Sequence, residues 1–464
     1  MIDIRSRRNQ HLAVFGLGAS GVAAARALAA SGARVAAWDD KDSQRRAARE
    51  RGIALTDLYK SGFSELDALV LAPGVPLTHD PHPIARRAQA VNKPIIGDIE
   101  LLTEACPRAR FIGITGTNGK STATALIGHI LDEVGYDTRI GGNLGPPALA
   151  FDPPGKDSVF VLELSSYQLD LTVKAAFDIA VWLNISPDHL DRHGGMDGYV
   201  AAKRRIFRDR ADPRRTQTAI IGVDDARSAA VRDDMEAREA WKVVSISATR
   251  RLERGVFVRN GALYDAIDDA AWCVCDLTGI PTLPGEHNWQ NAAAAYAAAR
   301  AIGIAPEAAA AAMTSYPGLP HRMERVATIG GVLYVNDSKA TNADAAARAL
   351  ACYRPVYWIA GGQAKGDGLG AALPFAGRIR HAFLIGDAEA AFAAALKDIV
   401  PATRCGALAD ALSEAHRMAQ REKLPGAVVL LSPACASFDQ FRNFEDRGNI
   451  FRKLVQALEA EAKP

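Results

Sequence analysis

The sequence is poor in cysteine and has almost no excess of charge of either sign. Six cysteines are scattered over 464 residues. The one close pair, Cys273 and Cys275, has neither metal-site spacing nor a second pair to match it. We therefore expect reduced, mostly buried thiols and no disulfide framework. The formal net charge of +2 argues against a chain that binds nucleic acid through a basic surface.

The sequence also lacks a long uninterrupted hydrophobic run. Its first ten residues are mostly polar, and Gly16 and Gly18 break the apolar stretch that follows. Neither a signal peptide nor a membrane span is therefore predicted. The composition, 48% hydrophobic and 23% charged, is typical of a globular protein. We expect a cytoplasmic protein without membrane insertion, with a monomer as the default.

A glycine-rich turn at residues 113–122 is the most informative segment that the chain does contain. It reads GITGTNGKST, follows an apolar strand predicted over 109–114, and leads into a helix predicted over 123–131. Backbone N–H groups at such a turn bind nucleotide phosphates, the lysine adds a positive charge, and the hydroxyl reaches Mg²⁺. Ile114 departs from the strict P-loop pattern, which points away from generic ATPases and GTPases. ATP is the ligand that this turn predicts.

A second glycine turn, Gly16-x-Gly18-x-x-Gly21, lies between a strand over 11–15 and a helix over 22–30. Asp39 and Asp40 follow at the end of the next predicted strand, as in sites for dinucleotides. Taken alone, this turn favours an NAD(P)-dependent dehydrogenase. It selects only a nucleoside diphosphate, however, and a UDP-sugar meets the same requirement. Two phosphate-binding turns in one chain therefore predict two ligands, ATP and a nucleotide-linked substrate.

The length and the alternation of strands and helices predict an α/β protein of three domains. Residues 1–104 form a Rossmann-like domain with a doubly wound parallel sheet. Residues 105–316 form a central P-loop-type ATPase domain with a mostly parallel sheet. Residues 317–464 form a second Rossmann-like domain, and the stretch 317–320 (PGLP) is the linker before it.

Acidic and imidazole groups follow two predicted strands of the central domain. Glu163 ends a strand over 158–162, and His189 lies in the segment 184–193 (NISPDHLDRH) after another. A carboxylate at this edge of a parallel sheet, beside the phosphate turn, is well placed for Mg²⁺. Lys203 lies on a predicted helix, and its neighbours in sequence alone indicate a solvated lysine.

In a series of blocks the chain resembles the Mur ligases, the amino-acid ligases of peptidoglycan precursor synthesis. The blocks occur in the family's order over essentially the whole chain and lie at 115–122, 142–145, 163–168, 184–189, 287–291, 318–324, 336–342, 361–365 and 432–441. The last block and the turn at 16–21 are similar to those of the members that add D-glutamate to UDP-N-acetylmuramoyl-L-alanine. The resemblance implies this activity, with domains 1–104, 105–316 and 317–464 binding the UDP substrate, ATP and glutamate.

The resemblance also implies roles for individual residues. ATP is expected at Gly116, Thr117, Asn118, Gly119, Lys120, Ser121, Thr122, Asn291, Arg322 and Asp337. The UDP substrate is expected at Gly18, Ala19, Ser20, Asp39, Gly74 and Asn143. Glutamate is expected at Lys339, Thr341, Lys365, Ser437 and Phe444. Two Mg²⁺ ions are expected, with Ser121, Glu163, His189 and Lys203 (as a carbamate) as ligands. Lys120, Glu163, His189 and Lys203 are the expected catalytic residues.

Several alternatives stay open at this stage. A ligase of the same build that adds L-glutamate is consistent with the same residue types, because chirality depends on small differences in placement. Folylpolyglutamate synthases and cyanophycin synthetases have a similar ATP turn, but lack the pairing of the turn at 16–21 with the block at 432–441. A dehydrogenase predicts NAD(P)H binding and no ATP turnover. Either Asp39 or Asp40 is the acid that contacts the uridine end of the substrate.

Overall fold

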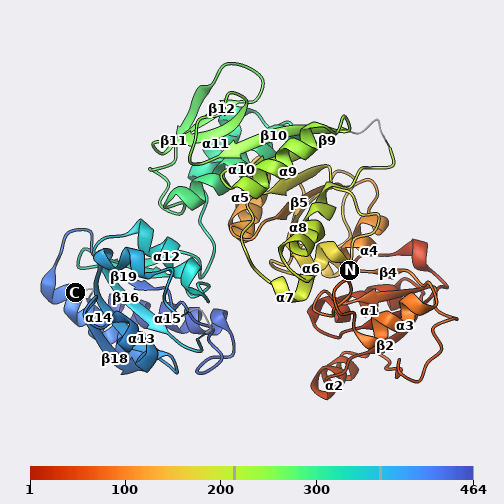
Figure 1. Ribbon diagram of the computed structural model, residues 1–464, viewed down its shortest axis with the longest axis horizontal. Helices are drawn as coiled ribbons and strands as arrows, with labels where there is room; N and C mark the ends of the chain where they lie inside the picture. The colour runs from red at the N-terminus through yellow and green to blue at the C-terminus, as the bar shows by residue number, and fades with distance from the viewer. Residues whose placement is uncertain (213–215, 365–367, 463–464) are drawn as a thin grey trace. The chain divides into compact units, whose positions relative to one another are not determined.

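The computed structural model describes residues 1–212, 216–364 and 368–462. The chain forms two compact units, Met1–Leu277 with Asn288–Tyr316, and Thr278–His287 with Pro317–Pro464. The first unit contains two β-sheets and the second contains one (Figure 1). Helices alternate with strands along the chain, and most neighbouring strands are parallel. The protein is therefore α/β with mostly parallel sheets, as the alternation predicts.

The first sheet has four parallel strands, in the order β2-β1-β3-β4. Its strands are β1 (His11–Phe15), β2 (Arg34–Trp38), β3 (Ala68–Leu71) and β4 (Ile95–Ile96). The helices of this part are α1 (Ala19–Ala30), α2 (Asp42–Glu50), α3 (Pro83–Ala90) and α4 (Asp98–Ala105). The strand, turn and helix predicted around Gly16 are present as β1 and α1, and the helix begins directly after Gly18.

The second sheet has nine strands, in the order β13-β12-β11-β10-β9-β8-β5-β7-β6. These are β5 (Arg110–Thr115), β6 (Thr138–Gly142), β7 (Val159–Glu163), β8 (Ile179–Trp182), β9 (Gln217–Gly222), β10 (Trp241–Ser247), β11 (Gly255–Arg259), β12 (Ala262–Ala266) and β13 (Trp272–Asp276). Only the pairs formed by β12 are antiparallel among these described strands. The helices that follow them are α5 (Lys120–Glu133), α6 (Ser166–Asp170), α7 (Leu190–His193), α8 (Met196–Arg204), α9 (Ala226–Glu236), α10 (Glu286–Ile302) and α11 (Pro306–Thr314).

The third sheet, in the second unit, has the order β14-β15-β19-β16-β17-β18. Its strands are β14 (Glu324–Ile329), β15 (Val332–Asn336), β16 (Val356–Gly361), β17 (Ile379–Ile385), β18 (Ala402–Gly406) and β19 (Val428–Leu431). β14 is antiparallel to β15, and the other neighbours are parallel. The helices are α12 (Ala343–Cys352), α13 (Glu389–Leu396), α14 (Leu408–Glu422) and α15 (Phe444–Ala462).

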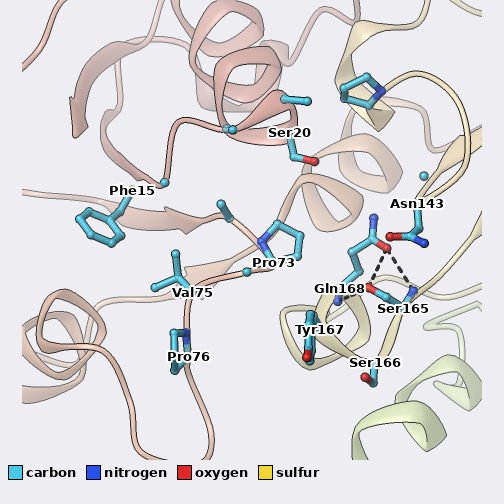
Figure 2. A pocket seen from close by; sticks show the side chains of 18 of the residues that line it. Phe15, Ser20, Pro73, Val75, Pro76, Asn143, Ser165, Ser166, Tyr167 and Gln168 are labelled. Atoms are coloured by element: carbon cyan, nitrogen blue, oxygen red, sulfur yellow. Dashed lines mark hydrogen bonds between the residues drawn. The ribbon is translucent and has the colours of Figure 1, made fainter. Parts of the chain in front are cut away.

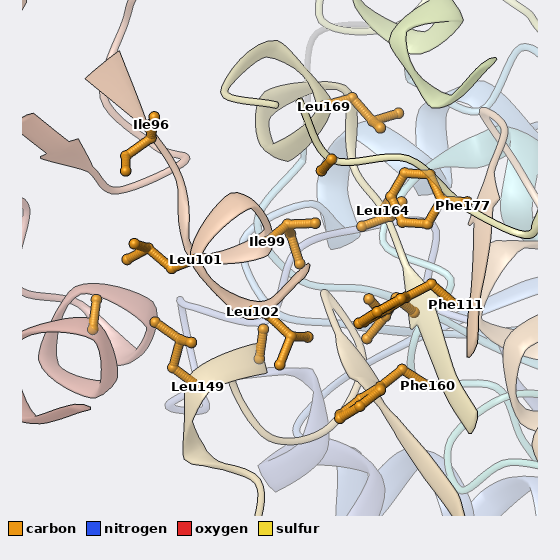
Figure 3. Packing of buried hydrophobic residues seen from close by; sticks show 14 of the residues in the cluster. Ile96, Ile99, Leu101, Leu102, Phe111, Leu149, Phe160, Leu164, Leu169 and Phe177 are labelled. Carbon is orange, nitrogen blue, oxygen red and sulfur yellow. The ribbon is translucent and has the colours of Figure 1, made fainter. Parts of the chain in front are cut away.

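The two sheets of the first unit share one hydrophobic core. Ile99 and Leu102 of α4 belong to the same buried cluster as Phe111 and Phe160 of the second sheet (Figure 3). The rings of Phe111 and Phe160 stack with centroids 5.1 Å apart. Each fully buried side chain of this size contributes about 1.5–3 kcal/mol to stability. Contact between the parts that carry the two glycine turns is therefore a packed interface.

A buried carboxylate reinforces this interface. Glu100 of α4, 6% exposed, accepts hydrogen bonds from the backbone N–H groups of Val173, Lys174 and Ala175 at 2.8–2.9 Å. Three N–H donors compensate for the loss of hydration that burial imposes on the charge. The carboxylate thus fastens the loop after α6 to the first helix beyond β4.

The cysteines differ in part from the expectation. All six are free, but only Cys106 and Cys435 are buried, so the expectation of mostly buried thiols was wrong. Cys273 is exposed because it lies on β13, the edge strand of the second sheet. Among the described helices, none is long and apolar enough to cross a membrane.

Candidate functional site

The first unit contains a cavity of about 810 Å³ between the turn after β1 and the loops after β6 and β7. Figure 2 shows Ser20, Pro73 and Val75 on one side, and Asn143, Ser165 and Gln168 on the other. All six residues expected to bind the UDP substrate line this cavity, namely Gly18, Ala19, Ser20, Asp39, Gly74 and Asn143. Lys120, His189 and Lys203 line it too. The structure therefore brings residues from both glycine turns to one cavity.

The turn after β1 requires glycine for steric reasons. Gly16 has φ +91°, and a Cβ at this position would lie 2.6 Å from Ala72 Cβ. A Cβ at Gly21 would lie 1.7 Å from the carbonyl oxygen of Gly16. The chain therefore turns tightly here, and the first N–H groups of α1 stay available for an anion at the helix N-terminus.

Asp39 and Asp40 have different surroundings. The Asp39 carboxylate accepts hydrogen bonds from the N–H groups of Leu17, at 2.6 Å, and Lys41, at 2.8 Å. Asp40 accepts from the Tyr59 hydroxyl at 3.0 Å, and one of its oxygens lies 3.1 Å from His82 Nε2. Asp39 thus braces the glycine turn, while Asp40 and His82 lie together at the cavity wall. His82 was missed by sequence reasoning, because it belongs to no recognisable motif.

The phosphate turn lies between β5 and α5. Gly119 has φ +83°, and a Cβ there would lie 2.2 Å from Asn291 Oδ1, which explains the glycine. The buried Asn291 of α10 therefore lies against the turn. Asn184 holds the turn from the other side, since its backbone carbonyl accepts from Thr117 N–H and its Oδ1 from Asn118 N–H.

Lys120, the first residue of α5, has its ammonium group directed back over the turn. Nζ donates to the carbonyl oxygens of Gly116 and Thr117, both at 2.9 Å. The positive charge thus lies at the same place as the N–H groups of the helix N-terminus. Both favour binding of an anion there.

Oxygen donors gather beside the phosphate turn at the end of β7. The Ser121 hydroxyl donates to Glu163 Oε2 at 2.5 Å, and Asn143 Nδ2 donates to Glu163 Oε1 at 2.7 Å. Glu163 is 2% exposed. A hydroxyl and a carboxylate next to a phosphate site are donors that suit Mg²⁺, which takes its remaining ligands from phosphate and water. Within the described part of the chain no cluster of three or more His, Cys, Asp or Glu forms a metal site.

Lys203 is buried, contrary to the solvated lysine that its sequence neighbours indicate. Its residue exposure is 1%, and Nζ donates to Gly116 O at 2.8 Å and Thr115 Oγ1 at 3.2 Å. Burial, and then the nearby charge of Lys120, holds the pKa of this amine well below its ordinary value. Sequence neighbours do not reveal this position, because tertiary folding places α8 beneath a turn almost ninety residues earlier.

His189 lies at the start of α7 with an unusual backbone conformation. Its φ of +51° is left-handed, and its ring lies 5.0 Å from that of Tyr167. Nε2 lies 3.4 Å from Asp188 Oδ2. The half-exposed imidazole is therefore presented to the cavity, with a carboxylate beside it.

The second unit holds the other predicted residues. Asp337, after β15, accepts hydrogen bonds from the Ser432 hydroxyl at 2.8 Å and the Met323 N–H at 3.2 Å. Burial raises its pKa to about 7, against the opposing effects of these hydrogen bonds and of the charge of Arg322. Thr341 lies in the loop between β15 and α12. Lys365 lies outside the described residues.

Two of the residues expected to bind glutamate, Lys339 and Phe444, are in contact. Lys339 Nζ lies 3.9 Å from the centroid of the Phe444 ring, and the Ser338 hydroxyl donates to Phe444 O at 2.8 Å. Ser437 is buried on the loop after β19. A side chain missed by sequence reasoning, Arg447, contacts both loops from α15. One arginine on an amphipathic helix gives no signal in the sequence.

Comparisons with known proteins agree over the whole chain. The Mur ligase middle domain matches residues 114–299, and the Mur ligase glutamate ligase domain matches residues 321–435. The chain is 50% identical to the UDP-N-acetylmuramoylalanine--D-glutamate ligase of Paramagnetospirillum magneticum over 460 residues, or 99% of each chain. It is 52% identical to the ligase of the same name from Rhodospirillum rubrum over 474 residues, covering 100% of this chain and 98% of the relative.

Solved structures show the same fold at much lower identity. The UDP-N-acetylmuramate-alanine ligase MurC from Thermotoga maritima aligns with a TM-score of 0.57 at 16% identity, covering 97% of this chain and 100% of that one. MurF from Acinetobacter baumannii aligns with a TM-score of 0.56 at 18% identity, covering 98% and 93%.

Proposed function

The chain belongs to the Mur ligase family, and we propose that it joins D-glutamate to UDP-N-acetylmuramoyl-L-alanine with conversion of ATP to ADP and phosphate. The observation that carries this function is the identity of about half of all residues, over the full length, with ligases of that name. The enzyme is an ATP-dependent acid–amino-acid ligase of peptidoglycan precursor synthesis. A cytoplasmic location follows as part of the proposal, because ATP and the UDP-linked substrate are cytoplasmic molecules.

Each of the three domains binds one ligand in this proposal. The Rossmann-like residues 1–104 bind the UDP substrate, the P-loop-type residues 105–316 bind ATP, and the Rossmann-like residues 317–464 bind glutamate. The cavity supports the first assignment, since it is lined by the turn at Gly16 and by Asp40 with His82. We assign the diphosphate to the turn and the uridine end to the Asp40 side, with Asp39 as the brace between them.

The first chemical step activates a carboxylate. The carboxylate oxygen of the terminal L-alanine forms a bond to the γ-phosphorus of ATP, while the bond from this phosphorus to the β,γ-bridging oxygen breaks. ADP leaves, and the substrate becomes an acyl phosphate. Catalysis of phosphoryl transfer is mainly a matter of positioning and charge stabilisation. The N–H groups of residues 116–121 and the ammonium of Lys120 supply both at the phosphates.

Two Mg²⁺ sites are part of the proposal. Ser121 and Glu163 would hold one ion, and His189 with Lys203 as a carbamate would hold the other. Bound Mg²⁺ supplies neutralisation of the phosphate charge. Two observations support this role for Lys203. It lines the cavity, and its Nζ donates to Gly116 O and Thr115 Oγ1 at the start of the phosphate turn. Addition of CO₂ to its amine, with loss of one proton, would give the oxygen donors that Mg²⁺ prefers.

The second step forms the amide. The glutamate nitrogen attacks the carbonyl carbon of the acyl phosphate and gives a tetrahedral intermediate. The bond from carbon to the phosphate oxygen then breaks, phosphate leaves, and the nitrogen loses a proton. The two glutamate carboxylates need cations and hydrogen-bond donors, and Lys339, Thr341, Ser437 and Lys365 are assigned to them. Phe444 has the Lys339 ammonium over its ring, 3.9 Å from the centroid, and is assigned to the aliphatic part of the substrate.

One assay tests the proposed function. The protein is incubated with UDP-N-acetylmuramoyl-L-alanine, ATP and Mg²⁺, with D-glutamate or L-glutamate in separate reactions, and the ligated product and released phosphate are measured. Product with D-glutamate alone, dependent on both ATP and the UDP substrate, is the expected result. Product with L-glutamate at the same rate would contradict the stereochemistry. NAD(P)H binding without ATP turnover would favour a dehydrogenase.

A further inference from the structure

Arg447 of α15 is one of the largest fully buried side chains of the second unit, with an exposure of 0%. Its guanidinium donates in four directions. Nε donates to Ser338 Oγ at 2.9 Å, and Nη2 donates to Ser338 O at 2.8 Å and to Cys435 O at 3.1 Å. Nη1 donates to Ala436 O at 3.4 Å. One side chain therefore joins the loop after β15 to the loop after β19.

All four acceptors of this guanidinium are uncharged. Across the described ranges 1–212, 216–364 and 368–462, no ion pair to Arg447 is formed. Burial lowers its pKa to about 10, while Asp439 and Asp337 act on it only through longer-range attraction. The group is therefore charged at neutral pH. An ion of this kind is costly to bury unless its hydrogen bonds are satisfied, which indicates that these loops are built around it.

The joined loops place the residues assigned to glutamate. Ser338 is followed by Lys339, and Ala436 is followed by Ser437. Phe444 lies one helical turn before Arg447 on α15, and its carbonyl oxygen accepts from the Ser338 hydroxyl at 2.8 Å. Lys339 and Ser437 are thus each one peptide bond from a residue that accepts a hydrogen bond from Arg447, and Phe444 is one helical turn from Arg447 itself.

The loop after β19 also needs an outside support. Ala434 has φ +58°, a left-handed conformation that is unfavourable for a residue with a Cβ. Ala436 exchanges two backbone hydrogen bonds with Gln363, at 2.9 and 3.0 Å. A Cβ at the preceding Gly362 would lie 2.4 Å from Ala436 O and 3.2 Å from Arg447 Nη1. Contacts from Arg447 and from residues 362–363 therefore hold a loop whose backbone is strained.

We propose that Arg447 is a positioning residue for the amino-acid substrate, acting through Lys339 and Ser437. Its planar guanidinium donates to both loops and so keeps them at a fixed separation. Its buried positive charge attracts the two carboxylates of the amino acid. A lysine retains the charge but cannot donate in four fixed directions. This inference rests on the proposed function, because it takes glutamate as the ligand of these loops.

The test compares three variants with the natural enzyme by steady-state kinetics. Arg447→Met removes the charge and the planar guanidinium but keeps a long unbranched side chain. Arg447→Lys keeps the charge and removes the planar guanidinium. Phe451→Leu is the matched control, because Phe451 is buried on the same helix but belongs to the hydrophobic cluster below. For each variant the KM values for D-glutamate, ATP and the UDP substrate are measured, together with kcat and the unfolding temperature.

We expect Arg447→Met to raise the KM for D-glutamate at least about tenfold, because a displacement of about 1 Å at a reacting group costs a comparable factor or more. The KM values for ATP and the UDP substrate should stay within about twofold. Arg447→Lys should give a smaller rise, and Phe451→Leu should lower the unfolding temperature without changing the KM for D-glutamate.

An unchanged KM for D-glutamate in folded Arg447→Met would overturn the inference. So would an equal rise in Phe451→Leu, since a merely structural role produces that result. If Arg447→Met does not fold, Arg447→Lys decides in its place, and an unchanged KM for D-glutamate in it overturns the inference. A natural enzyme that does not use D-glutamate refutes the proposed function instead, so the two failures are distinguishable.

Discussion

Lys203 in the first unit and Arg447 in the second are both fully buried basic side chains that donate to backbone carbonyl groups. They differ in how burial affects their charge. The pKa of Lys203 is held well below its ordinary value by burial and by the charge of Lys120. The pKa of Arg447 falls only to about 10, because a guanidinium starts from a higher value and spreads its charge over three nitrogens.

Burial therefore has different chemical consequences for the two side chains. An amine that loses its proton is a nucleophile and can be converted to a carbamate, whereas a guanidinium stays a fixed cation with fixed directions. Lys203 contacts the turn between β5 and α5, and Arg447 contacts the loops after β15 and β19, which we assign to glutamate. In our account Lys203 serves formation of the acyl phosphate, and Arg447 serves capture of the amino acid.

The largest effect is expected at the cation next to Lys203. Lys120→Ala should lower kcat/KM about 10³-fold or more, because a positive charge on the transferred phosphoryl group contributes on this scale. Folding should change little, since Lys120 Nζ donates to carbonyl groups within its own turn. Phosphate release and circular dichroism measure the two properties, and a well-folded variant with an intact turnover number would remove the turn from the mechanism.

Loss of the buried amine itself is expected to be slightly less severe. Lys203→Ala should lower activity roughly 10²- to 10³-fold, and a short carboxylic acid in solution should restore part of it, because it supplies the missing oxygen donors. Lys203→Arg should be inactive without such rescue, since the guanidinium fills the space and forms no carbamate. The control is Arg204→Ala on the same helix, whose side chain is 38% exposed. Full activity of Lys203→Ala would show that the carbamate role is wrong.

Lys203 and Arg447 also show which features of the protein sequence patterns could predict and which they could not. Both glycine turns, their flanking elements and the place of Glu163 followed from local patterns, because a strand, a tight turn and a helix N-terminus are specified by neighbouring residues. Lys203 gained its role only from the family resemblance, and Arg447 was missed. Their contacts join residues 87 and 109 positions apart, a separation that no local pattern reports. The different roles that we propose for Asp39 and Asp40 likewise rest on their hydrogen bonds, because the two residues are adjacent and of the same type in the sequence.

The acid near Arg447 gives a prediction about pH. Asp337 has its pKa raised to about 7 by burial, so the folded state binds a proton that the unfolded state releases near pH 4. The stability from this proton is present at low pH and is lost as pH rises through about 7. The difference in unfolding free energy between the natural protein and Asp337→Asn should therefore decrease by a few kcal/mol between pH 4 and pH 8. Denaturant unfolding at several pH values measures it, and a difference independent of pH would contradict the buried, protonated acid.

The smallest effect is expected where groups are less buried. Asp39→Asn should raise the KM for the UDP substrate several-fold, because one of the N–H groups that its two oxygens hold then faces an amide nitrogen. Asp40→Asn, at a side chain that is 48% exposed, should raise it only about twofold, as expected for one exposed polar contact. Binding isotherms for the UDP substrate compare the two variants. A larger effect at Asp40 would reverse the assignment of brace and uridine contact.

Our account assigns Lys203 to formation of the acyl phosphate and Arg447 to capture of the amino acid. Trapping of the acyl phosphate in the absence of glutamate tests this assignment most directly. Each enzyme is mixed with ATP, Mg²⁺ and the UDP substrate, and hydroxylamine then converts the acyl phosphate to a hydroxamate that is measured by mass spectrometry. Our account predicts hydroxamate from Arg447→Met at the level of the natural enzyme, and almost none from Lys203→Ala. Normal trapping in Lys203→Ala, or its loss in Arg447→Met, would contradict the account.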